Sequence, residues 1–360
     1  MSLFSTYLYR VLNKELFLKD RQASVLDATV EDYIHSVTPV GSKSLLQNHG
    51  FKCSPATIRH ELNALDKEGY LVQPHSSSGR IPTEKGYRFY VDGLKNRLDK
   101  KSAEDNIVNG LSVVGSSVKE VLHHVSEVLS TSLNYTTLLM MPSVVQDTLK
   151  ATHFVLLDMN RILIVLMTAM GVNKELLCES DHDLTQEELT YLSQLLSSKV
   201  TGKQVIDINE EMIKELIHEL PKYDKILNHL LQTIKQFSSS SEDRIETACY
   251  GQAKLLQFPE FSDLDFAKEV MSLLEETQTL RNLFQKVSLL RRKQKVLIGE
   301  ETGEKRLKEC SVVMAPIEHQ DTFLGTVCFL GPTRMQYSKL LPLVDSITER
   351  VDTFLKQEYK

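Results

Sequence analysis

SPATIRHELNALDKEGYL, residues 54–71, carries the signals of one short helix at both of its ends. Ser54 can cap the first free amides of a helix, and Pro55 suits the first helical position because its ring presets the backbone. Gly69 can adopt the left-handed conformation that commonly closes a helix. Three apolar side chains recur between them at the spacing of one helical face: Ile58, Leu62 and Leu65. The sequence therefore predicts a helix over residues 54–68 with one buried face.

The opposite face of this helix is mostly polar and cationic. At about 100° per residue, four residues point away from the apolar face and two flank it: Ala56, His60, Asn63 and Lys67, then Thr57 and Arg59. Hydroxyl, amide and cationic groups can address base edges or phosphates in the major groove of DNA. A solvated face on an ordinary helix has the same composition, so this helix alone leaves both interpretations open.

A hairpin is predicted directly after this helix. Residues 70–73 have the composition of a strand, residues 73–80 are polar and rich in serine, and the apolar pattern resumes at Ile81. Arg80 is expected at the tip of the loop, where a cation can enter a minor groove or bind a phosphate. Thr83 can cap a further helix. A plain hairpin on a domain that binds no DNA is the alternative.

Two helices are predicted upstream, over Arg21–Val37 and over Ser42–His49, and Gly50 ends the second. With the helix at 54–68 they make a three-helix core whose second and third members form a helix-turn-helix. Ser42 and Lys43, at the start of the second helix, are candidates for phosphate contacts. The order of helices and hairpin favours a winged helix-turn-helix.

The residues expected to contact DNA lie in these helices and in the hairpin loop. They are Ser42, Lys43, Ser54, Ala56, Thr57, Arg59, His60, Asn63, Lys67, Ser78, Gly79 and Arg80.

At these residues the sequence resembles the bacterial heat-inducible transcription repressors of the HrcA type. The N-terminal segments that carry the resemblance are PVGSK (39–43), SPATIR (54–59), GYL (69–71) and SGRIPT (78–83). The C-terminal segments are IGEE (298–301), LG (324–325) and GPTRM (331–335). The resemblance extends from about Arg21 to the end of the chain.

This resemblance implies a fold and a function beyond what the residues alone indicate. It implies a GAF-like domain interrupted by a dimerising insert, control of chaperone operons, and release from DNA on heat stress. It also implies that a chaperonin, which folds the repressor, supports its activity. From sequence we therefore expect an α+β multidomain protein: a winged helix-turn-helix, then a GAF-like α/β domain with a mainly helical dimerisation insert.

Length and composition fit a protein of two or three domains with buried cores. The chain has 360 residues, of which 41% are hydrophobic and 25% charged. Residues 1–97 hold 13 Lys and Arg against 10 Asp and Glu, a balance of +3, and the remainder holds 29 against 38, a balance of −9. A mildly basic N-terminal part on an acidic body suits a local anionic partner.

The sequence also bears on the cellular compartment. Its longest apolar run, residues 162–170, is too short to span a bilayer, and the N-terminus lacks a secretion signal. Five scattered cysteines without a C-x-x-C pattern suggest reduced thiols, several of them buried, rather than disulfides or a zinc site. We therefore expect a cytoplasmic protein with no membrane contact.

The predicted domain boundaries follow changes in the residue pattern along the chain. They are 1–97 for the winged-helix domain (with 1–20 as an extra helix or mobile arm), 98–106 for a charged hinge, 107–201 and 264–360 for the two parts of the GAF-like domain, and 202–263 for the helical insert. Apolar residues from Ile107 to Val128 alternate four and three apart. This pattern fits either a paired-helix seam or a helix packed on its own sheet.

Motifs of enzymes and of cofactor or metal sites are missing from the sequence. It contains no Walker A loop, G-x-G-x-x-G, H-E-x-x-H, G-x-S-x-G or EF-hand pattern. We assign no catalytic residue, no cofactor and no metal, and we expect a homodimeric repressor on an inverted-repeat operator. The alternatives are a repressor with an inducer in its GAF-like domain, a winged-helix adaptor that binds protein and, least favoured, an enzyme.

Overall fold

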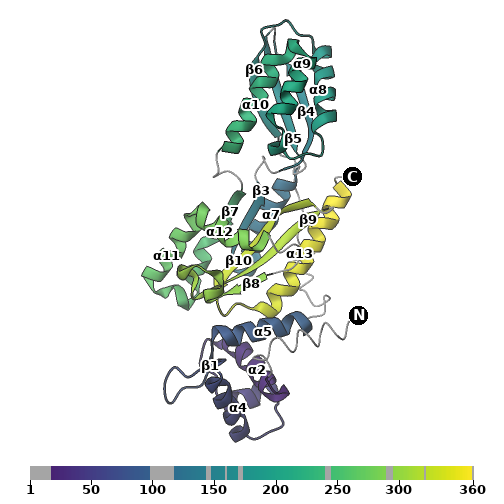
Figure 1. Ribbon diagram of the computed structural model, residues 1–360. Coiled ribbons are helices and arrows are strands. Elements are labelled where there is room, and N and C mark those ends of the chain that lie inside the picture. The colour runs from purple at the N-terminus through teal and green to yellow at the C-terminus, as the bar shows by residue number, and fades with distance from the viewer. Residues whose placement is uncertain are drawn as a thin grey trace.

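The computed structural model describes residues 18–97, 117–142, 147–158, 160–168, 173–239, 245–288, 295–319 and 322–358. They form three units stacked along one direction (Figure 1). We call residues 18–97 the head, residues 147–239 the outer unit, and the remaining described residues the central unit. The central unit lies between the other two (Figure 1).

The head contains four helices and a two-stranded hairpin. Its elements are α2 (Asp20–Ser36), α3 (Ser42–His49), α4 (Pro55–Lys67), β1 (Leu71–Val72), β2 (Ile81–Pro82) and α5 (Glu84–Arg97). Each helix lies within one or two residues of its predicted position. Gly50 closes α3 at φ 62°, and Gly69 follows α4 at φ 76°, as expected of left-handed closing residues. Leu26, Leu45 and Ile58 are fully buried between the helices.

The central unit is built on an antiparallel five-stranded sheet in the order β7-β3-β10-β9-β8. Its strands are β3 (Thr136–Pro142), β7 (Ile245–Tyr250), β8 (Lys295–Ile298), β9 (Cys310–His319) and β10 (Thr322–Pro332). Alternate residues of the strands enter different hydrophobic clusters: Leu139 and Val313 pack on one face, Leu138 and Met314 on the other. Both faces of the sheet are therefore covered, and its strands are apolar at consecutive positions.

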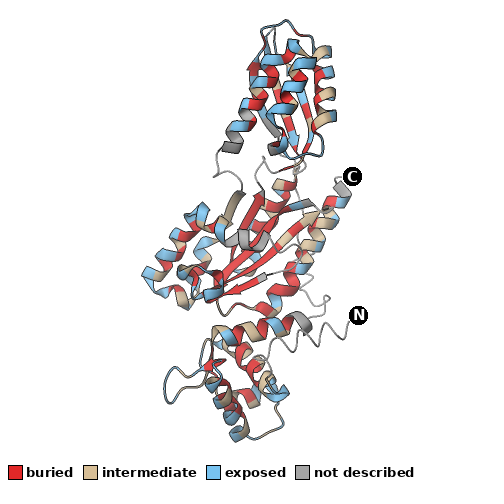
Figure 2. Ribbon diagram, viewed as in Figure 1, coloured by how far each residue is buried: buried red, intermediate tan, exposed pale blue. Residues whose placement is uncertain are grey.

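Helices supply the two covers of this sheet. The first face packs against α7 (Val118–Leu133) and α13 (Tyr337–Glu358). The second packs against η4 (Gln252–Gln257), η5 (Pro259–Ser262), α11 (Leu264–Glu275) and α12 (Thr277–Ser288). Two short turns, η6 (Gly299–Thr302) and η7 (Lys305–Leu307), follow β8. Figure 2 shows β3, β9 and β10 as largely buried, whereas β7 at the edge of the sheet is partly exposed.

The outer unit is inserted between β3 and β7. It comprises β4 (Leu149–Leu156), β5 (Arg161–Thr168), β6 (Asn173–Glu179), α8 (Gln186–Val200), η2 (Val205–Asp207), α9 (Glu210–Glu219), η3 (Pro221–Tyr223) and α10 (Asp224–Ser239). The strands form an antiparallel sheet in the order β4-β5-β6, and one face packs under the helices in a hydrophobic cluster separate from those of the central unit. Thr185 and Glu188 form a capping box at the start of α8.

The packing of this insert differs from the grouping expected from sequence. Strands β4–β6 and helix α8 were expected in the GAF-like domain, with an insert over 202–263. In the structure they share one core with α9 and α10, whereas η4 and η5 pack with the central unit. Strand propensity cannot distinguish the two sheets, because pairing partners are set by tertiary contacts.

The described part of the predicted apolar repeat packs within the chain. Val118, Val121 and Val125 of α7 are at most 4% exposed and join the core over β3. Ile107, Leu111 and Val114 lie outside the described residues. Over α7 the structure therefore favours a helix packed on its own sheet. All five cysteines are free, and Cys178, Cys310 and Cys328 are buried, as predicted.

Candidate nucleic-acid interface

Helix α4 is capped as its sequence predicts. The Ser54 hydroxyl accepts a hydrogen bond from the Thr57 amide at 3.2 Å and lies 2.9 Å from the Thr57 hydroxyl. Ile58, Leu62 and Leu65 are at most 5% exposed. This burial determines which side of α4 faces the core of the head and which side faces water.

The water-facing side of α4 carries the predicted contact residues. Five of them are exposed and Thr57 is half-buried; the exposed residues are Ala56, Arg59, His60, Asn63 and Lys67. Figure 1 places α4 at the end of the molecule, with α5 between the rest of the head and the central unit. The face is therefore open to a large partner without rearrangement of the chain.

The hairpin loop is held by its own hydrogen bonds. The Gln73 side-chain amide donates to the carbonyl oxygens of Ser76 and Ser78, each at 3.0 Å. The Ser78 hydroxyl donates to the His75 carbonyl at 2.7 Å. These bonds keep the exposed end of the loop, His75 to Ser77, in one shape.

Arg80 lies at the base of the loop, so its predicted place at the tip is wrong. Its backbone pairs with Val40 through hydrogen bonds of 2.8 and 2.9 Å. Its guanidinium donates to Asn63 Oδ1 at 2.8 Å and forms an ion pair with Asp66 at 2.9 Å. The side chain is 12% exposed. Arg80 thus joins the hairpin to α4 instead of reaching outward.

Gly79 and Ser42 also have roles in packing. A Cβ on Gly79 would overlap the Val40 carbonyl, so glycine permits the backbone pairing of its neighbour. Ser42 is 8% exposed at the start of α3, whereas Lys43 beside it is exposed. Of these two residues, only Lys43 presents its side chain openly to solvent.

Two polar contacts that the sequence did not predict position these helices. Glu61 is 5% exposed and pairs with Arg21 at 2.7 Å, which ties α4 to α2. Asp32 pairs with His49 at 2.8 Å and accepts from the Asn48 amide at 3.0 Å, which ties α2 to α3. A signal for Glu61 existed, because it lies three residues after Ile58 on the apolar side of α4.

Other kinds of site find little support among the residues that the structure describes. No group of three or more His, Cys, Asp or Glu side chains there could hold a metal ion. A cavity of about 10 Å³ in the central unit is lined only by apolar side chains, among them Leu138, Leu274 and Met314. Within the same residues, no helix is long and apolar enough to cross a membrane.

Comparison with known proteins gives the context of this surface. Residues 119–341 match the family described as "HrcA protein C terminal domain". The heat-inducible transcription repressor HrcA of Alkaliphilus metalliredigens is 32% identical over 349 residues, covering 95% of this chain and 99% of that protein. The repressor of the same name from Geobacter sulfurreducens is 33% identical, with the same coverage.

The chain belongs to the HrcA family of heat-inducible transcription repressors.

HrcA proteins are transcription repressors, not enzymes, as the sequence predicted. A crystal structure described as that of a hypothetical protein resembles this chain with a TM-score of 0.65 and 24% identity, covering 95% of this chain and 99% of that one. This likeness supports the mixed helix and sheet architecture described above.

Proposed function

We propose that this HrcA chain represses chaperone operons by binding an inverted-repeat operator as a homodimer. The head acts as a winged helix-turn-helix that places α4 in the major groove. The observation that carries this proposal is the water-facing side of α4, where Arg59, His60 and Asn63 are exposed opposite a buried apolar face. Because the target is chromosomal DNA, the protein acts in the cytoplasm.

The contacts divide into base readout and backbone positioning. Thr57, Arg59, His60 and Asn63 are the candidates for base edges, with Ala56 small enough to let the helix approach. Lys43, Lys67 and the exposed end of the hairpin loop are the candidates for phosphates. Ser42, Ser54 and Gly79 contribute through the local backbone that they shape.

Arg80 takes a different role from the one expected of a loop tip. Its guanidinium occupies Asn63 Oδ1, so the Asn63 amide nitrogen is left as the group that points to a partner. An amide nitrogen donates to acceptors such as guanine O6 and N7 or thymine O4. Arg80 therefore positions a base-reading side chain.

The outer unit is the proposed dimerisation insert. The uncovered face of its sheet exposes Val155, Leu157, Met167 and Leu177 by 38–54%. Val155, Leu163 and Leu177 are cross-strand neighbours, so these side chains form one apolar area. An uncovered apolar sheet face is a common protein-binding surface, and a second copy would bury it symmetrically.

Heating is the proposed signal for release. Two heads bind an inverted repeat tightly only while the body holds them at the correct spacing, so loosening one interface lowers the affinity for DNA. The chaperonin implied by the family resemblance would restore the folded repressor. The small apolar cavity of the central unit gives no support to a polar inducer as the alternative signal.

A binding titration tests this function. The full-length protein is titrated into fluorescent duplexes of the upstream region of a chaperone operon and of a scrambled sequence at the same salt concentration. We expect the operator to bind more tightly by a factor of roughly 10³ or more. Equal binding of the two duplexes would contradict the proposal, and binding of neither would favour the protein-binding adaptor.

A further inference from the structure

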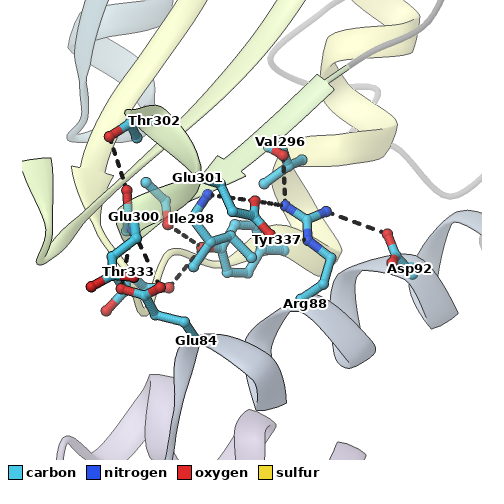
Figure 3. A network of polar contacts seen from close by, with 12 residues as sticks. Glu84, Arg88, Asp92, Val296, Ile298, Glu300, Glu301, Thr302, Thr333 and Tyr337 are labelled. Carbon is cyan, nitrogen blue, oxygen red and sulfur yellow. Dashed lines mark hydrogen bonds and ion pairs between the residues drawn. The ribbon is translucent and has the colours of Figure 1, made fainter. Parts of the chain in front are cut away.

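Two C-terminal segments that resemble family signatures, residues 298–301 and 331–335, lie in the central unit, far from α4 in the sequence. The turn after β8, residues 298–301, contacts α5 directly, and Tyr337, which begins α13 shortly after the second segment, packs on the same helix (Figure 3). Helix α5 packs against β8 and α13 at the junction of head and central unit. DNA binding by α4 does not by itself explain these two segments.

Arg88 of α5 makes the main polar contact across the junction. Its Nε donates to Glu301 Oε1 at 2.8 Å, and one terminal nitrogen contacts the other Glu301 oxygen. The same terminal nitrogen donates to the Val296 carbonyl at 2.7 Å, and the other pairs with Asp92 at 3.3 Å (Figure 3). Glu301 also accepts from the Ile298 amide at 3.0 Å, so one carboxylate closes its own turn and holds the head.

Glu84, one turn before Arg88, makes a second contact that requires a glycine. Its carboxylate accepts from the Glu300 amide at 3.2 and 3.3 Å (Figure 3). A Cβ on Gly299 would overlap this carboxylate, and Gly299 has φ 52°, in the left-handed region. The backbone of the turn at 298–301 is thus shaped to bind the Glu84 carboxylate in the first turn of α5.

Aromatic side chains close the apolar part of the junction. Tyr87 of α5 is 3% exposed and Tyr337 of α13 is fully buried, with their ring centroids 6.4 Å apart. The Tyr337 hydroxyl donates to the Thr333 carbonyl at 2.7 Å. Residues of the head and of the central unit belong to one hydrophobic cluster. The junction is therefore a packed and charged interface.

We propose that residues 298–301 and Tyr337 form an intramolecular docking site for α5, and that its occupancy sets the direction in which each head presents α4. This inference rests on the proposed DNA-binding function and names its regulation. Docking through α5 leaves α4 on the far side of the head, so the docked form is the one that binds DNA (Figure 1). Heat release begins with undocking, before the body unfolds.

Charge reversal across the junction tests this proposal. The full-length variants are R88E, E301R and the double variant R88E/E301R, with E269R on the exposed surface of α11 as the matched control. The probe is a duplex that the wild-type protein selects from a random pool. Each single reversal places like charges in contact, so we expect roughly tenfold weaker binding and release at a lower temperature. The double variant regains part of both, because it restores opposite charges but not the hydrogen bonds of Glu301 with Ile298 and of Arg88 with Val296. E269R matches the wild type.

A second measurement separates this proposal from the proposed function. The Glu300 amide donates to the Glu84 carboxylate, so its rate of hydrogen exchange reports docking in the absence of DNA. Circular dichroism reports whether each variant is folded. Faster exchange in the single variants with unchanged DNA affinity and release temperature would overturn the docking proposal alone. Tighter DNA binding by the single variants would also overturn it, because the docked form would then be inhibitory. A wild-type protein that selects no duplex would refute the DNA-binding function itself.

Discussion

Arg80 shows how one ion-paired residue fixes the orientation of a neighbouring side chain, that of Asn63. The Arg80 guanidinium holds the Asn63 side-chain carbonyl oxygen and the Asp66 carboxylate together, one helical turn apart on α4. Fixing a side chain before its partner arrives reduces the conformational entropy lost on binding. The conformation of the hairpin loop, which ends at Arg80, and the orientation of the Asn63 side-chain amide are therefore coupled.

Substitution of Arg80 tests this coupling. R80A frees the Asn63 amide and leaves Asp66 without its partner, so we expect about tenfold weaker operator binding. The salt dependence should stay unchanged, because a 12% exposed, paired guanidinium releases no counterion from DNA. R80K is the control that retains charge without the fork geometry, and it should lose base discrimination similarly. A salt slope reduced by about one would instead indicate a direct phosphate contact.

At the scale of elements, the sequence predicted what local chemistry determines. The bounds of α4 follow from Ser54, Pro55 and Gly69, each of which acts on its own neighbours. The place of Arg80 was mispredicted because Val40 and Asp66 are brought to it by tertiary packing. The pairing of Glu84 with residues 299–300 was equally unpredictable, since more than 200 residues separate them.

The outer sheet shows the same limit. The β-rich runs at residues 153–157 and 162–169 indicate β4 and β5, but the sequence predicted neither β6 nor a separate sheet. Their burial alternates along the chain, with one face under α8–α10 and the other uncovered. Such alternation indicates a one-sided sheet once pairing partners are known.

A charge on the uncovered face should separate the two copies. We expect L177E to shift the protein from dimer to monomer in sedimentation velocity, because a buried unpaired carboxylate costs several kcal/mol at an interface. L256E, at a 55% exposed leucine of the central unit, is the control. A dimer that persists in L177E at micromolar concentration would exclude this face as the interface.

At the scale of the molecule, buried thiols distinguish undocking from unfolding. Burial raises the pKa of Cys178 and of Cys249 to about 11, and it raises the pKa of Cys310 and of Cys328 further. A raised thiol pKa leaves little thiolate below that value, so these groups should resist thiol reagents at pH 8 while folded. Both Cys310 and Cys328 lie in the core of the central sheet.

Thiol labelling during heating therefore separates undocking of the head from unfolding of the central unit by the temperature of each. We expect DNA release at a temperature below that at which Cys310 and Cys328 become reactive, because undocking leaves the central core intact. Mass spectrometry of the labelled peptides measures reactivity, and anisotropy of the bound duplex measures release. Coincident transitions would show that release requires unfolding of the central unit.

The most direct test of the account is guanine-methylation interference on the selected duplex. Methyl groups at guanine N7 lie in the major groove, where α4 is proposed to bind. We predict two symmetric patches of interference, with centres one helical turn or a multiple of it apart, and loss of a guanine from both patches in R59A, at a cost of about 1–3 kcal/mol. Interference that is absent, or unchanged by R59A and by N63A, would contradict the placement of α4 in the groove.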